Sequence, residues 1–138
     1  MNKEFIPYEQ ALALKELGFD KPCVYYVDKD NNSYIYNFET HPDEFIEWCG
    51  VNVIPTPTFS QAFRFFREKY KLRGFIGFRP NTKQFDFHVY DMSLSGKEYV
   101  KQRTMEAFNK DPKVGTYEES EIECLIKLIE ICKTKTNE

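Results

Sequence analysis

The chain has 138 residues, a formal net charge of −3, and 17% aromatic residues, with 13 Phe and 9 Tyr. This length suits a single core, so we expect one domain over residues 1–138. The sequence contains no run of about 18 apolar residues and no apolar leader after Met1. These features argue against a membrane or secreted protein, and we predict a cytoplasmic one.

The first predicted element is a helix that begins at Pro7 and stops at Gly18. Proline suits the first helical turn, and glycine suits the left-handed backbone just past a helix end. With Gly18 in that position, Leu14 and Phe19 are the pair whose apolar contact accompanies a Schellman cap. We therefore predict that these two side chains touch.

Stretches rich in β-branched and aromatic residues flank the turn-forming segment 30–32, which predicts a β-hairpin over residues 23–38. Pro42 then favours a short helix with Phe45 and Trp48 packed inward. The prolines of segment 54–57 exclude a helix there and predict a rigid extended lead-in.

The central helix starts at Thr58, because Gln61 three residues later completes a capping-box pattern. Its residues separate into an apolar face and a basic face at helical spacing. The apolar face holds Phe59, Ala62, Phe63, Phe66 and Tyr70, and the basic face holds Arg64, Arg67 and Lys71.

A second hairpin follows, with an extended segment 72–78, a turn at 79–82 and a strand at 84–90. The last strand alternates cleanly. Phe85, Phe87 and Val89 fall on one side, and Asp86, His88 and Tyr90 on the other. Residues 93–115 mix turn formers with scattered apolar residues, which predicts an irregular, mobile excursion.

Thr116 and Glu119 form a second capping box, which predicts a C-terminal helix. Its expected buried face is Ile122, Leu125, Ile126, Ile129 and Cys132, with Leu128 beside them. The predicted fold class is α+β, in the order α-ββ-α-ββ-α: two antiparallel β-hairpins form a sheet on which three helices pack.

The four cysteines form no CxxC pair and each lies in an apolar pattern, so we expect buried free thiols. The two histidines, His41 and His88, have no cysteine nearby. We therefore expect neither a metal site nor a cofactor.

Segment 64–83 carries seven basic residues against one acidic residue, an excess of +6 in a chain that is otherwise −9. Such an excess can mark an anionic partner, and it can equally neutralise acidic helices packed against the segment. For the basic stripe of the central helix, we favour an ordinary solvated helix face over an anion site. The candidate anion- or partner-binding residues are Arg64, Arg67, Lys71, Arg73 and Arg79. The candidate aromatic contact residues are Tyr34, Tyr36 and Tyr90, whose rings offer stacking surfaces.

His88 beside Asp86 or Asp91 suggests a general base, but the sequence shows no nucleophile that accompanies it. We therefore expect no catalytic residue. A hydrolase is kept as an alternative that requires a pocket to gather His88 with carboxylates.

Three motifs carry a resemblance: residues 5–12 through 17–20, residues 57–70, and residues 116–119 with the helix that follows. Together they resemble a family of small uncharacterised tailed-phage and prophage proteins from Bacteroidetes-type hosts. That family usually has glycine after the tyrosine of the central helix, where this chain has Lys71. The resemblance implies a phage accessory protein and no particular activity.

These features favour a non-enzymatic binding protein that acts in the cytoplasm of the host cell on a host or phage protein. The alternative is binding of nucleic acid or a nucleotide signal through segment 64–83. A homodimer is a further alternative, to be judged by an exposed aromatic patch.

Overall fold

The computed structural model describes residues 4–36, 42–49, 53–93 and 116–136. Tertiary contacts divide the chain into two compact units, Met1–Ala62 and Phe63–Glu138, and the division falls inside helix α3 (Phe59–Lys69). From the sequence we expected one domain over residues 1–138 and did not predict a division into two units. Except for Ser93, the predicted excursion 93–115 lies outside the described residues.

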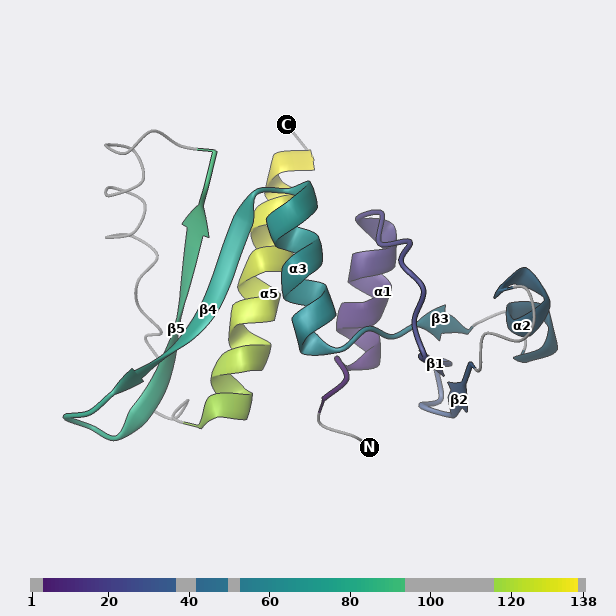
Figure 1. The fold of residues 1–138 in the computed structure, drawn as a ribbon, viewed down its shortest axis with the longest axis horizontal. Coiled ribbons are helices and arrows are strands. Elements are labelled where there is room, and N and C mark those ends of the chain that lie inside the picture. Colours follow the sequence, from purple (N-terminus) through teal and green to yellow (C-terminus); the bar gives the residue numbers. More distant parts are fainter. Residues whose placement is uncertain (1–3, 37–41, 50–52, 94–115, 137–138) are drawn as a thin grey trace. The chain divides into compact units, whose positions relative to one another are not determined.

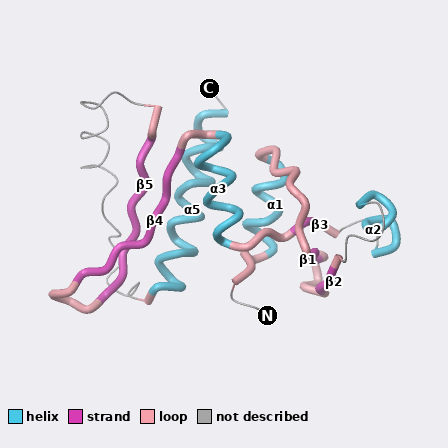
Figure 2. The backbone as a smooth tube through the Cα atoms, viewed as in Figure 1, coloured by secondary structure: helices cyan, strands magenta, loops and turns pink. Residues whose placement is uncertain are grey.

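The first unit contains a three-stranded antiparallel sheet in the order β2-β1-β3 (Figure 2). Strands β1 (Tyr25–Val27) and β2 (Ser33–Ile35) form the predicted hairpin. Strand β3 (Ile54–Pro55) lies in the predicted extended lead-in, where the Thr56 N–H donates to the Tyr25 carbonyl at 2.8 Å. The lead-in is therefore also a strand. The sequence pattern does not indicate that it pairs with β1.

Helix α1 (Tyr8–Glu16) ends in the predicted Schellman cap. Gly18 has φ 100°, and the Phe19 N–H donates to the Leu14 carbonyl at 2.9 Å. Both side chains are buried. The cap directs the chain from the helix back into the core of the first unit.

Helix α2 (Pro42–Cys49) confirms the predicted short helix, but the prediction that Trp48 packs inward is wrong. Trp48 is 78% exposed, whereas Phe45 lies 5.1 Å from Tyr26 and 4.8 Å from Tyr36, measured between ring centroids. Helix α2 has eight residues and packs against one ring cluster. Only its side chains that face this cluster are therefore buried.

Helix α3 begins with the predicted capping box. The Gln61 N–H donates to Thr58 Oγ1 at 3.2 Å, and the Thr58 N–H donates to Gln61 Oε1 at 2.9 Å. Of the predicted apolar face, Phe59, Ala62 and Phe66 are buried, and Phe63 and Tyr70 are half-buried. Phe65 is also buried, so the apolar face is broader than predicted.

The second unit is built on the hairpin of β4 (Leu72–Arg79) and β5 (Gln84–Asp91). Lys71, with φ 57°, takes the left-handed position between α3 and β4, although it is not a glycine. The turn extends one residue beyond the prediction, because the Lys83 N–H closes it on the Arg79 carbonyl at 2.8 Å.

Helix α5 (Tyr117–Thr136) packs along one side of this hairpin, and Figure 1 shows it beside β4. Its capping box is formed, since the Glu119 N–H donates to Thr116 Oγ1 at 3.1 Å. The residues of α5 that are buried are Ser120, Cys124, Leu125, Leu128, Ile129 and Cys132. Ile122 and Ile126, expected in this set, are only half-buried.

The fold is therefore α+β, with helices and antiparallel hairpins close to the predicted order. In the described residues the two hairpins lie in separate sheets, not in the single sheet predicted. All four cysteines are free thiols, three of them buried and Cys49 half-buried. No described helix has the length and apolar character needed to cross a bilayer.

Candidate functional site

The two faces of the β4–β5 hairpin differ in what they contact. The α5 face carries Leu72, Gly74, Ile76 and Phe78 on β4, and Phe85, Phe87, Val89 and Asp91 on β5. The Asp86 face carries Arg73, Phe75, Gly77 and Arg79 on β4, and Gln84, Asp86, His88 and Tyr90 on β5. The predicted alternation along β5 is confirmed by this register.

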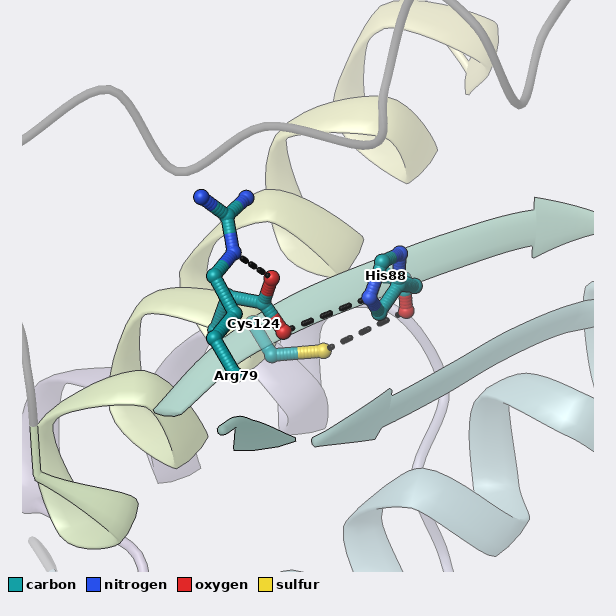
Figure 3. Close-up of polar contacts among 4 residues, drawn as sticks. Arg79, His88 and Cys124 are labelled. Atoms are coloured by element: carbon teal, nitrogen blue, oxygen red, sulfur yellow. Dashed lines mark hydrogen bonds and ion pairs between the residues drawn. The ribbon is translucent and has the colours of Figure 1, made fainter. Parts of the chain in front are cut away.

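Asp86 is the polar centre of its face, and it is only 6% exposed. Its Oδ2 accepts a hydrogen bond from Arg79 Nε at 2.6 Å. Its Oδ1 lies 3.3 Å from His88 Nε2. A buried carboxylate is costly unless it is paired, and here both oxygens have partners from neighbouring positions of the hairpin (Figure 3).

Gly77 makes room for this cluster, because it lies directly opposite Asp86 in the register. A Cβ at position 77 would lie 2.7 Å from Asp86 Oδ1 and 3.1 Å from His88 Nε2. The missing side chain leaves the hollow in which the carboxylate lies. This explains how an aspartate on the polar side of a strand becomes buried.

Aromatic rings lie next to the carboxylate cluster on the same face. Phe75 stacks on His88, with ring centroids 4.9 Å apart and planes inclined by 21°. Tyr90 lies 5.2 Å from Phe75. The Arg73 guanidinium carbon lies 5.6 Å from the Phe75 ring centroid, a cation–π contact. The face therefore combines rings with a positive charge.

His88 is poorly placed to act as a general base. Its Nε2 faces Asp86, and its other nitrogen, Nδ1, is buried and has no hydrogen-bond partner among the described residues. A general base needs a nitrogen that reaches the substrate. With one nitrogen on a carboxylate and the other covered, the ring supports the carboxylate and stacks on Phe75.

The thiol nearest to this histidine lies on the other side of the hairpin. Cys124 Sγ lies 4.0 Å from the His88 carbonyl oxygen (Figure 3). Burial raises the pKa of this thiol to about 12, and the charge of Glu121 adds to the increase. A thiol with so high a pKa stays protonated near neutrality and is a poor nucleophile.

The structure does not bring the five predicted basic residues together. Arg64 Nε pairs with Glu68 Oε1 at 3.1 Å on the exposed side of helix α3, and Arg79 pairs with Asp86. Arg67 is exposed on α3. Arg73 and Arg79 share the Asp86 face, but six residues of strand separate them by about 20 Å. Lys71 and Arg73 are exposed at the junction of α3 and β4.

The three predicted contact tyrosines differ in exposure. Tyr36 is 3% exposed, so its ring is core and is not a surface for stacking. Tyr34 is half-buried, and its hydroxyl donates to Asp28 Oδ2 at 3.3 Å. Tyr90 is half-buried on the Asp86 face, in the ring group described above.

Sequence reasoning missed Phe75 and Gly77 as members of this face. The hairpin register would have found both. A turn that pairs Arg79 with Gln84 also places Phe75 opposite His88 and Gly77 opposite Asp86. The sequence left two carboxylates, Asp86 and Asp91, as the neighbour of His88. The register selects Asp86, because Asp86 shares the face of His88 and Asp91 lies on the α5 face.

Within residues 4–36, 42–49, 53–93 and 116–136, no group of three or more His, Cys, Asp or Glu side chains is arranged to hold a metal ion. The phage resemblance stays a prediction. No protein-family model, described protein or solved structure shows a significant match to this chain.

Proposed function

We propose that this chain is a non-enzymatic binding protein and that the Asp86 face of the β4–β5 hairpin is its contact surface. The observation that carries the proposal is the paired carboxylate. Both Asp86 oxygens have partners, and the free nitrogen of His88 is buried. This arrangement leaves neither group ready for proton transfer, whereas it holds the neighbouring rings in fixed positions.

The side chains around the carboxylate are suited to recognition. Arginine and aromatic residues are enriched in binding surfaces because they offer large contact areas and directional contacts. Here Arg73, Phe75 and Tyr90 are adjacent and partly or fully exposed. Their positions are set by the strand pairing and do not depend on a loop.

In this proposal the protein is a phage accessory protein that meets a host or phage macromolecule in the cytoplasm of the host cell. The support for phage origin is the resemblance of the three sequence motifs. We expect the gene to lie among tailed-phage genes, and sequencing its flanks in the source genome tests this. A gene surrounded only by host housekeeping genes would contradict it.

Site-specific photo-crosslinking tests the contact surface. A benzoylphenylalanine at position 90 lies on the Asp86 face, and one at position 117, where Tyr117 is 45% exposed on α5, is the matched control. In lysate of the source cells, we expect discrete adducts from position 90 and none from position 117. Equal adducts from both positions, or none from position 90, would overturn the proposal.

A further inference from the structure

Exposed positive charge and aromatic rings lie close together at one end of this hairpin. Lys71 and Arg73 are exposed where α3 meets β4, and the Lys71 carbonyl accepts a hydrogen bond from Met92 N–H at 2.8 Å, just past β5. Arg73 lies opposite Tyr90 in the register. At the turn end, the Arg79 charge is offset by Asp86, and exposed Lys83 lies in the turn, outside the strand register. At the junction end, the Asp91 carboxylate is buried on the α5 face. The Asp86 face therefore offers an anionic ligand an exposed charge beside rings at the junction end.

We propose that Lys71, Arg73, Phe75, His88 and Tyr90, here called the junction surface, bind single-stranded nucleic acid. This inference rests on the proposed function, because it names the ligand of the same face. Rings accept stacked bases of any sequence, and lysine and arginine contact phosphates. The junction surface provides both kinds of contact side by side.

The length of the junction surface favours a strand over a single nucleotide. Lys71 and Phe75 are four residues apart, which corresponds to about 13 Å along a β-strand. A single strand spaces its phosphates more widely than the roughly 3.4 Å rise of a duplex strand, so this length covers fewer nucleotides than it would in a duplex but more than one. A mononucleotide would contact only part of it.

The rings also favour a single strand over a duplex. In a duplex the base faces are covered by their neighbours in the stack, and only base edges and phosphates are presented. Tyr90, and the side of the Phe75 ring that does not stack on His88, would then have no base face to contact. In a single strand the base faces are accessible to such rings.

The composition agrees with this ligand. Segment 64–83 carries an excess of +6 while the rest of the chain carries −9. The structure narrows the segment further, because Arg64 and Arg79 are already paired with carboxylates. Of the other five basic residues, Arg67 and Lys69 lie on α3 and Lys83 lies in the turn, whereas Lys71 and Arg73 lie at the junction, where Arg73 contacts a ring of the Asp86 face.

Fluorescence anisotropy with labelled oligo(dT) and oligo(U) of about 12 nucleotides tests the inference, and a duplex of equal length is the comparison. We expect single-strand binding at about 50 mM salt that weakens strongly by about 200 mM. No binding at low salt, or equally tight binding of the duplex, would overturn the inference.

Two variants locate the contact without disturbing the fold. Lys71→Gly removes a charge from a residue whose φ of 57° suits glycine, and Arg73→Ala removes an exposed side chain. Each is expected to weaken binding about fivefold or more and to reduce the salt slope by about one. Arg64→Ala, which removes the same charge from α3, is the control and should change affinity less than about twofold. Equal losses from all three would contradict the inference.

Stacking is tested with Phe75→Leu, which keeps an apolar side chain at that position. The expected loss is about tenfold, typical of removing one stacked base contact. Thermal unfolding identifies any loss of fold. If Phe75→Leu is unstable, the Lys71→Gly and Arg73→Ala results decide the question.

The crosslinking experiment separates failure of the inference from failure of the proposed function. Adducts from position 90 that disappear after nuclease treatment support a nucleic-acid ligand. Adducts that survive nuclease and contain protein leave the proposed contact surface intact and overturn the single-strand assignment.

Discussion

The two glycines of β4 lie on opposite faces of the same hairpin and differ in what they accommodate. Gly74 lies against α5, where a Cβ would be 2.7 Å from Cys124 Sγ and 3.0 Å from Leu128 Cδ1. Gly77 lies on the Asp86 face, where a Cβ would meet the ends of the Asp86 and His88 side chains. The first glycine allows helix and sheet to approach, and the second allows a carboxylate to be buried.

The two faces of β4 therefore have different roles: the face against α5 stabilises the fold, and the Asp86 face is the proposed contact surface. On the α5 face, Cys124 and Leu128 are fully buried and have no room to move. On the Asp86 face, one of the two groups nearest to Gly77, the His88 side chain, is 22% exposed and therefore has room to shift. The same substitution should therefore have a large cost on one face and a small cost on the other.

The largest effect is expected for Gly74→Ala. The added methyl overlaps Cys124 Sγ and forces α5 away from β4, so we expect a loss of about 1–3 kcal/mol in unfolding free energy. Urea denaturation followed by circular dichroism measures it. A midpoint equal to that of the unaltered protein would show that α5 does not approach β4 as closely as described.

A smaller effect is expected for Gly77→Ala. Alanine lowers the entropy of the unfolded chain, a gain of about 0.4–1 kcal/mol that offsets part of the clash. We expect a net stability change within about 1 kcal/mol, together with displacement of His88 from Asp86. NMR of the His88 ring reports the displacement. A loss as large as that of Gly74→Ala would remove the contrast between the faces.

The smallest effect is expected for Ser120→Ala, on the buried side of α5. Ser120 is fully buried, and its Oγ has no hydrogen-bond partner within the described parts of the chain. Removing an unpaired buried hydroxyl recovers its desolvation cost, so we expect unchanged or slightly higher stability, by up to about 1 kcal/mol. Thermal unfolding measures it. A clear loss of stability would mean that the hydroxyl has a partner.

The helix ends were predictable in residue-level detail. The Schellman cap at Gly18 and the capping boxes at Thr58 and Thr116 all form as expected. Each depends on side chains and backbone groups within five residues of one another. Such short-range geometry follows from the local chain, and so does the alternation along β5.

Burial was less predictable. The sequence does not distinguish Phe45, which enters a ring cluster, from Trp48, which is exposed. It also does not show that Asp86 is buried while Arg73, on the same face, is exposed. These outcomes depend on which neighbours lie opposite each side chain across strands and helices.

The sequence by itself determined where α1 ends and where α3 and α5 begin, which side of β5 is polar, and which segment carries the excess of positive charge. The tertiary structure alone decided that the hairpins lie in separate sheets, that Arg79 is paired, that Lys71 is exposed, and that Arg73 is exposed next to a ring. The physical reason is how far apart in the sequence the interacting residues lie. Caps and alternation arise from nearby residues, whereas burial and charge pairing arise from residues brought together only when the chain folds.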